Sequence, residues 1–181
     1  MELVAHQSSS YKPRTVHNAS TADLTVAFAE DFHTAGERLT KKEAGKKYVG
    51  IPLSLDPIEA ARKLYVACKV HNVKTLNVAG NGIYSLTEKG WTQESLNQWV
   101  FQVLLKVHEY LPFVKIISGG QTGVDIAGGV AGCAIGLDVT MTFPKGFMQR
   151  NVDNIDITQS IDDIRKKVNE YVAKIDKNQK I

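Results

Sequence analysis

The sequence predicts an α/β protein, a single Rossmann-like domain with a mostly parallel sheet and helices on both faces. Three observations lead to this prediction. Short apolar runs typical of strands alternate with segments whose apolar residues recur at helical spacing. Several of these runs end in polar or glycine-rich turns. The chain has 181 residues, enough for one domain with a hydrophobic core, and we expect residues 1–181 to form it.

The first half of the chain is expected to alternate strands and helices after an irregular N-terminus. Residues 1–20 are expected to be irregular. Strands are expected at residues 23–28, 48–53 and 73–79, and helices at residues 34–44 and from residue 56 onward. The helix from residue 56 has the clearest start. Asp56 is its N-cap, Pro57 stands at its first position, and Glu59 is the expected capping-box partner.

The second half continues the alternation. A polar connection is expected at residues 83–92, and strands are expected at residues 114–117 and 138–142. Helices are expected at residues 94–110, capped by Thr92, from near Thr122, and at about residues 160–176, capped by Ser160. The helix after Thr92 has an apolar stripe that includes Trp99. We expect this stripe to pack in the hydrophobic core, and part of it could also contact another protein chain. The C-terminal helix is expected to turn five side chains inward: Ile161, Ile164, Val168, Tyr171 and Ile175.

The most informative stretch is residues 114–125, VKIISGGQTGVD, which predicts a strand, a tight glycine turn and a helix. Gly119 and Gly120 let a ligand approach the backbone because they have no Cβ. A helix starting near Thr122 aims its N–H groups at an anion. We therefore expect replacement of Gly120 to abolish ligand binding with little loss of stability. A plain strand-to-helix turn is the alternative, since neither G-x-G-x-x-G nor a Walker A loop is present.

Ligands of parallel sheets bind beyond the carboxyl ends of the strands. Four expected strand ends carry polar or glycine-rich turns, at residues 29–36, 80–82, 118–123 and 143–146. We expect these turns to meet at one pocket.

The segment SGGQTGVD resembles the opening motif of the molybdenum carrier proteins, which belong to the Rossmann-like SLOG superfamily with the cytokinin-activating phosphoribohydrolases and the DNA-processing protein A family. Residues 11–18 (YKPRTVHN) are similar to that family's Tyr-x-x-Arg-Thr-x-x-Asn segment, and residues 143–146 (FPKG) to its Pro-Lys-Gly turn. Residues 23–40 and 59–80 resemble further strands and helices of the family. The SGGQTG strand comes first in the family and late here, so the chain resembles a circular permutant, which nearby termini would permit.

The resemblance implies a site for a nucleotide-like or phosphorylated small molecule. Ser118, Thr122 and the amides of residues 119–123 would hold phosphate, and Arg14 would pair with it. Asn18, Gln121 and Asn81 would read a ribose or a base. Asp125 would bond ribose hydroxyls, or else is simply a favourable charge at a helix N-terminus. The remaining candidate ligand-binding residues are Gly36, Arg38, Gly80, Gly119, Gly120, Gly123 and Lys145.

Departures from the family leave enzymatic activity open. The phosphoribohydrolases carry Pro-Gly-Gly-x-Gly-Thr-x-x-Glu, whereas this chain has Ala35-Gly36-Glu37-Arg38 near that place. Glu37 either activates water, with Asp125 as the other candidate catalytic residue, or caps its helix. Glu30 and Asp31 offer acid–base chemistry or form a solvated loop. The alternatives to a binding protein are therefore a nucleoside-phosphate or ADP-ribose-type glycohydrolase and a carrier of molybdate or molybdenum cofactor.

Composition favours a soluble cytoplasmic protein. Hydrophobic residues make up 43% and charged residues 23%, and the net charge of +3 is mild. We find no signal-peptide pattern and no apolar run long enough to span a membrane. Cys68 and Cys133 are expected to be buried thiols, and the five histidines lack zinc spacing. The residues identify no cofactor. A homodimer is compatible with the sequence. Two lysine clusters are expected on solvated faces rather than on nucleic acid: Lys41, Lys42, Lys46 and Lys47, and Lys174, Lys177 and Lys180.

Overall fold

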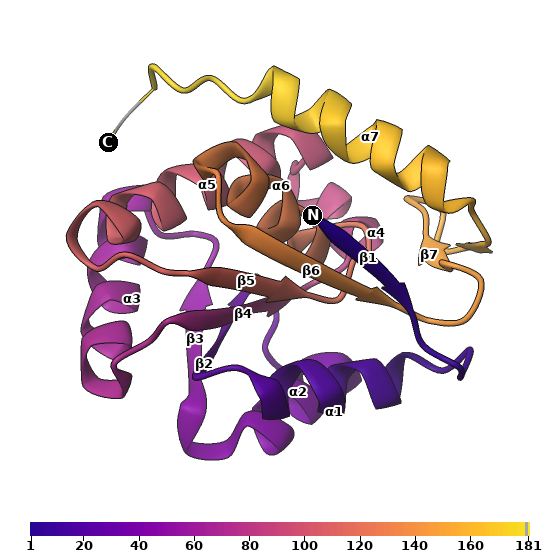
Figure 1. Ribbon diagram of the computed structural model, residues 1–181, viewed down its shortest axis with the longest axis horizontal. Helices are drawn as coiled ribbons and strands as arrows, with labels where there is room; N and C mark the ends of the chain where they lie inside the picture. The colour runs from indigo at the N-terminus through magenta and orange to yellow at the C-terminus, as the bar shows by residue number, and fades with distance from the viewer. Residues whose placement is uncertain (180) are drawn as a thin grey trace.

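The computed structural model describes residues 1–179 and Ile181, so Lys180 of the second lysine cluster lies outside the described residues. A six-stranded sheet forms the centre of the molecule (Figure 1). Its pairings are all parallel, which confirms the predicted fold class. The strand order is β1 (Glu2–Ala5), β6 (Asp138–Phe143), β5 (Lys115–Ser118), β4 (Thr75–Gly80), β2 (Leu24–Ala29) and β3 (Tyr48–Pro52).

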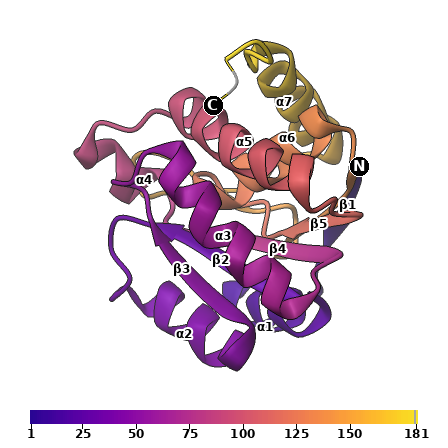
Figure 2. The same ribbon diagram turned by 90° about the vertical axis from the view of Figure 1, so that its left-hand side faces the viewer.

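Helices cover both faces of this sheet (Figures 1 and 2). Helices α1 (Tyr11–Thr21) and α2 (Ala35–Ala44) pack together on one face. The opposite face carries α3 (Pro57–His71), α5 (Gln93–Tyr110) and α6 (Val124–Ile135), with α5 packed between the other two. Helix α7 (Ile161–Lys174) lies outside this layer against α6. None of the helices in the described part of the chain is long and apolar enough to cross a membrane.

The two faces of the central strands carry different side chains. All six residues of β2 are buried, as expected for a strand covered on both sides. Leu24, Val26 and Phe28 alternate along β2 and belong to the main hydrophobic core, where Phe28 meets Trp99 of α5 edge to face. The residues between them, such as Thr25, are smaller. The α1–α2 face of the sheet therefore has space for a pocket.

The N-terminal prediction was wrong, because residues 1–20 contain a strand and most of a helix. β1 is an edge strand held to β6 by backbone pairing, and Leu3 is its one buried side chain, so it shows no apolar alternation. Helix α1 begins after the N-cap Ser10 and buries Arg14 and Asn18 in place of an apolar stripe. Hydrophobic periodicity could not find either element.

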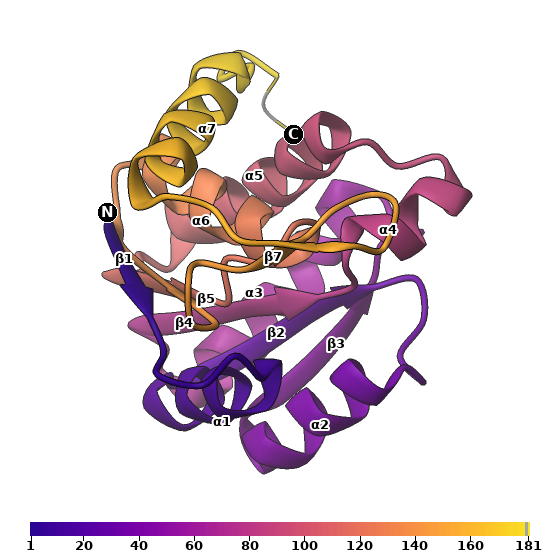
Figure 3. The ribbon, with the colours of Figure 1, turned by 90° about the vertical axis from the view of Figure 1, so that its right-hand side faces the viewer.

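The connection at residues 83–92 was also wrongly predicted, because it contains the short helix α4 (Ile83–Leu86) and a 3₁₀ turn, η2 (Thr87–Lys89). A second 3₁₀ turn, η1 (Gly45–Lys47), leads from α2 into β3. An unexpected antiparallel hairpin, β7 (Gln149–Arg150) and β8 (Asp156–Ile157), follows β6. Figure 3 looks at the carboxyl ends of the strands and shows the segment around β7 crossing in front of them.

The predicted helix caps are mostly confirmed. Thr92 and Ser95 form a reciprocal capping box, and Ser160 accepts from the Asp163 N–H at the start of α7. Asp56 accepts from the N–H groups of Ile58 and Glu59, but the Glu59 side chain does not accept from the Asp56 N–H, so the expected capping box is not formed there. Two side-chain predictions need correction. Ile161 is 37% exposed because it stands at the first position of α7, and Cys133 is only partly buried, unlike Cys68.

Candidate functional site

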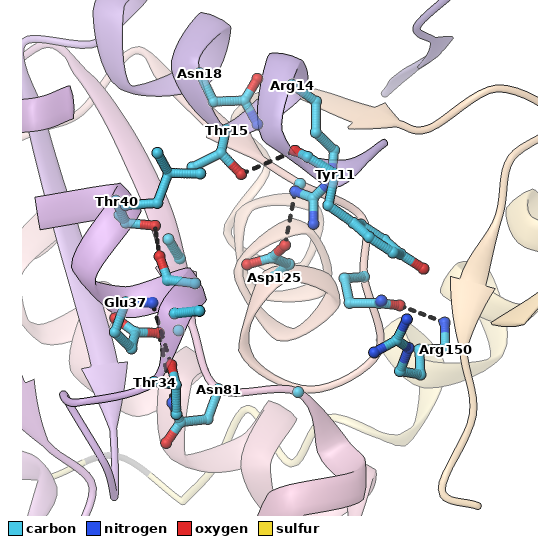
Figure 4. Close-up of a pocket in the computed structure, with 18 of the residues that line it drawn as sticks. Tyr11, Arg14, Thr15, Asn18, Thr34, Glu37, Thr40, Asn81, Asp125 and Arg150 are labelled. Carbon is cyan, nitrogen blue, oxygen red and sulfur yellow. Dashed lines mark hydrogen bonds and ion pairs between the residues drawn. The ribbon is translucent and has the colours of Figure 1, made fainter. Parts of the chain in front are cut away.

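A pocket of about 350 Å³ lies at the carboxyl edge of the sheet, on the α1–α2 side (Figure 4). It is placed at a change of direction in the topology. After β2 the chain turns through α2 on one face toward β3, and after β4 it turns through α5 on the other face toward β5. Such a divergence opens a crevice between adjacent strand ends, where open α/β sheets bind their ligands.

The buried wall of the pocket is polar. Arg14 and Asn18 come from α1, Glu37 from the first turn of α2, Asn77 from β4 and Asp125 from the first turn of α6. All five are at most 7% exposed. Four of them carry a buried polar atom that lacks a hydrogen-bond partner among the described residues: Arg14 Nε, Asn18 Oδ1, Glu37 Oε2 and Asn77 Oδ1. Buried polar atoms in native proteins are nearly always hydrogen-bonded, so this concentration points to a polar ligand.

Arg14 and Asp125 form an ion pair inside this wall. Arg14 Nη1 donates to Asp125 Oδ2 at 3.0 Å, and both side chains are less than a tenth exposed. Burial raises the pKa of Asp125, while the Arg14 guanidinium and the N–H groups of Gln121 and Gly80 oppose that rise. The pair also covers Gly119, where a Cβ would lie 1.5 Å from Arg14 Nη1. The glycine therefore makes room for the ion pair.

Glu37 is the group whose chemistry is most altered by the pocket. Thr34 caps the backbone of α2 by accepting from the Glu37 N–H, and the Glu37 carboxyl faces Asn81, whose Nδ2 lies 3.5 Å from Oε1. The expected alternative, in which this carboxyl caps the helix, is therefore not what the structure has. Burial, reinforced by the charges of Asp125 and Asp31, raises the pKa of Glu37 to about 8. At neutral pH this buried carboxyl holds its proton.

The rim of the pocket is aromatic and basic, and sequence reasoning missed it. Arg150 of β7 binds Asp156 of β8 in a bidentate ion pair at 2.8 and 2.9 Å. Its guanidinium lies 5.5 Å from the ring centre of Tyr11 and 5.8 Å from that of Tyr84. The Tyr11 hydroxyl donates to Asp156 Oδ1 at 2.7 Å, and burial, followed by this carboxylate, raises the pKa of Tyr11 to about 12. The exposed Lys12 also lines the pocket.

The glycine turn after β5 does not offer the expected row of amides to an anion. The N–H groups of Gly120, Thr122 and Gly123 donate instead to Ser118 Oγ, Gln121 Oε1 and Gln93 Oε1, at 3.3, 3.0 and 2.7 Å. The Ser118 hydroxyl donates to the Asp125 carbonyl at 2.6 Å, and the Thr122 hydroxyl to the Arg150 carbonyl. These bonds hold the turn within the fold and use the amides of Gly120, Thr122 and Gly123 and the hydroxyls of Ser118 and Thr122.

Gly120 itself also has a structural role. Its φ is +66°, and a Cβ there would lie 2.3 Å from the Phe143 ring. Such a position disfavours any side chain, both for its backbone conformation and for the contact. The expectation that Gly120 can be replaced with little loss of stability is therefore wrong.

The pocket collects nine of the candidate residues and leaves six outside. Those that line it are Arg14, Asn18, Gly36, Glu37, Gly80, Asn81, Gly119, Gln121 and Asp125. Those that do not are Arg38, Ser118, Gly120, Thr122, Gly123 and Lys145. Arg38 bonds the His33 carbonyl on an exposed surface, and Lys145 is exposed while its N–H bonds Ser8. Three of the four expected turns reach the pocket, and the turn at residues 143–146 does not.

Further lining residues were missed, and one of them had a visible signal. Asn77 is a polar residue inside the apolar run VKTLNVA. Burying a polar side chain in a strand costs free energy unless it is hydrogen-bonded, so its presence there is a signal of a polar site. The loop carboxylates Glu30 and Asp31 lie outside the pocket. Their N–H groups both donate to Asn81 Oδ1, which holds the loop beside Glu37.

Comparison with models of known protein families and with curated protein sequences gave no match for this chain. Among the described residues, no group of three His, Cys, Asp or Glu side chains is placed to hold a metal ion.

Proposed function

We propose that this protein binds a nucleotide-like small molecule in the pocket between α1, α2 and the carboxyl ends of β4 and β5. The observation that carries the proposal is the set of four unpartnered buried polar atoms on the pocket wall, at Arg14, Asn18, Glu37 and Asn77. Leaving buried polar atoms without partners costs about 1–3 kcal/mol each, and a polar ligand that shifts these side chains on binding would recover part of that free energy.

We also propose that the chain is a circularly permuted member of the SLOG superfamily. The support is that residues from four of the resembling segments line one pocket. Arg14, Gly36, Gly80 and Gly119 represent these four segments, which are widely separated along the chain.

The test combines mass spectrometry of any small molecule that copurifies with calorimetry of a panel of nucleosides and nucleoside 5′-monophosphates. We expect at least one to bind the wild type and to bind Asn77→Ala at least tenfold more weakly. Thr25→Val is the matched control, because Thr25 Oγ1 accepts from Asn77 Nδ2 at 3.2 Å without lining the pocket. Equal affinity in wild type and Asn77→Ala would exclude this pocket as the site.

A second candidate function, hydrolysis of an N-glycosidic bond, is favoured by the state of Glu37. A carboxyl with a pKa of about 8 keeps its proton near neutral pH and can donate it to a leaving base nitrogen. Water would add to the anomeric carbon as the C–N bond breaks, the base would leave with the Glu37 proton, and the proton released by the water would restore the Glu37 carboxyl. Asp125 differs by being ion-paired to Arg14, so the two carboxyls have distinct environments.

An assay for base released from nucleosides, nucleoside monophosphates and ADP-ribose separates this candidate from simple binding. Release that is lost in Glu37→Gln while binding persists supports the hydrolase. No release in the presence of measurable binding supports the binding protein. The molybdate-carrier alternative needs an oxyanion site, and the amides at Gly120, Thr122 and Gly123 that would build it are bonded within the protein.

A further inference from the structure

A second cavity, of about 470 Å³, lies between the hairpin β7–β8, α4, the start of α5 and α7 (Figure 3). The hairpin separates it from the first pocket. Arg150 lines the first pocket, whereas its chain neighbours Gln149 and Asn151 line the second cavity, and no described residue lines both. Adjacent side chains of an extended segment point to opposite sides. The two sites therefore share one wall and have separate interiors.

The surface of the second cavity is largely apolar. Ile83 is buried there, and the rings of Trp91 and Tyr171 line the cavity with Val152 and Ile157 of the hairpin region. Val152 and Ile157 remain 56% and 44% exposed. A concave surface of this size with apolar and aromatic walls is typical of a site for a small molecule. A ring that covers these side chains would remove apolar surface from water.

Most of the polar side chains that line the cavity are bonded within the protein. The hydroxyls of Thr87 and Thr122 donate to backbone carbonyls. The side-chain amides of Gln93, Gln149 and Asn151 bond backbone groups. These groups hold the walls in place, so apolar contact is the main interaction that the cavity offers a ligand.

Two polar groups on α7 are different. Lys167 and Tyr171 line the cavity one helical turn apart, and neither the ammonium nor the hydroxyl has a hydrogen-bond or ion-pair partner among the described residues. Burial and the charges of Glu94 and Glu170 raise the pKa of Tyr171, so its hydroxyl keeps its proton and can donate. Glu94 is itself paired with Lys174 at 3.0 Å, and Glu170 is exposed. Lys167 is the only charged residue in the described lining, so the cavity favours an anionic group at α7.

We infer that this cavity is a second ligand site, for a small aromatic carboxylate. Its ring covers the apolar wall that includes Trp91 and Ile157, and its carboxylate accepts hydrogen bonds from Lys167 and Tyr171 on α7. The inference is independent of the proposed function, because the residues that carry it do not line the first pocket.

The experiment is an amide NMR titration of the full chain at low ionic strength, where a charge near the surface has its largest effect. The probes are 3-phenylpropionate, 3-phenylpropanol and 3-phenylpropylamine, which share a ring and chain and differ in the terminal group. We expect the carboxylate to bind about threefold or more tighter than the alcohol, and the amine to bind most weakly. Asn151 and Lys167 should shift, while Gly36 and Gly80 of the first pocket should not.

Two variants separate the apolar and charged contributions. Ile157→Ala should weaken all three probes by about threefold or more. Ile155→Ala is its control, because Ile155 is 58% exposed on the same hairpin and does not line the cavity. Lys167→Gln should remove the preference for the carboxylate and leave the affinity of the alcohol unchanged. Lys166→Gln, at an exposed neighbouring position outside this cavity, should preserve the preference. Thermal unfolding of each variant verifies that it is folded.

Three results would overturn the inference. Absence of shifts with every probe at millimolar concentration would show that the cavity is not a site for this class of ligand. An alcohol or amine that binds as tightly as the carboxylate would exclude the role given to Lys167. Shifts confined to Gly36 and Gly80 would show that the probes occupy the first pocket instead. None of these results bears on nucleotide binding by the first pocket.

Discussion

Arg14 on α1 bonds Asp125 on α6 at 3.0 Å, although the two residues are 111 positions apart in the sequence. Because α1 and α6 lie on opposite faces of the sheet, this ion pair joins the two helical layers at the carboxyl edge. It forms the centre of the pocket wall, with Glu37 on one side and the Arg150 rim on the other. The pair therefore has a structural role that is separate from ligand binding.

Removing one partner of this pair should be strongly destabilising. Arg14→Met leaves the Asp125 carboxylate buried without its counter-ion, and we expect a loss of about 3–5 kcal/mol in the free energy of unfolding. Urea denaturation measures this change. The double variant Arg14→Met with Asp125→Leu removes both charges and should recover much of the loss. A single variant as stable as the wild type would contradict the role assigned to the pair.

Gly120 is expected to be needed for folding. Gly120→Ala should cost about 1–3 kcal/mol more than Gly136→Ala by urea denaturation. Both positions have positive φ, +66° and +92°, but a Cβ at Gly136 meets no atom within 4 Å whereas one at Gly120 meets the Phe143 ring. The difference between the two variants isolates that contact. Equal costs would show that the ring moves aside freely.

The raised pKa of Glu37 predicts that the free energy of unfolding depends on pH. Burial raises its pKa from 4.5 to about 8, so the folded protein holds the proton more tightly than the unfolded chain does. The stability contributed by this proton is present below about pH 4.5 and is lost as the pH rises to about 8. Glu37→Gln should remove this part of the pH dependence, which is on the order of 5 kcal/mol.

The measurement is urea denaturation of wild type and Glu37→Gln at pH 5 and pH 9. We expect the variant to gain stability relative to wild type at the higher pH. Glu88→Gln, a change of an exposed carboxylate on the 3₁₀ turn η2, serves as the control and should show no such gain. Parallel pH profiles for wild type and Glu37→Gln would contradict the raised pKa.

The parts of the site that the sequence predicted lie in local patterns. The central strand β5 and the helix starts could be predicted because their signals involve only neighbouring residues. These signals are the apolar run before Ser118, the glycines after it and the N-cap Asp56. Arg14 and Asn18 entered only through a family resemblance, because α1 buries polar side chains and lacks an apolar stripe. No local pattern marks that kind of helix.

The rest of the site depends on contacts between distant segments. Arg150 reaches Tyr11 and Tyr84 because the hairpin β7–β8 crosses the carboxyl edge of the sheet, and two-residue strands leave no period to detect. The amides of the glycine turn looked available in sequence. Gln93, 30 residues earlier, occupies one of them, which only the fold could reveal.

The central claim is that a nucleotide-like molecule occupies this pocket, and an amide NMR titration with a nucleoside 5′-monophosphate tests it most directly. Glycines inside and outside the pocket provide matched reporters of ligand binding. We predict shifts for the pocket-lining Gly36, Gly80, Gly82 and Gly119, with Gly45, Gly90 and Gly136 unchanged. Shifts confined to the second group, or no shifts at millimolar ligand for any of the common monophosphates, would contradict the claim.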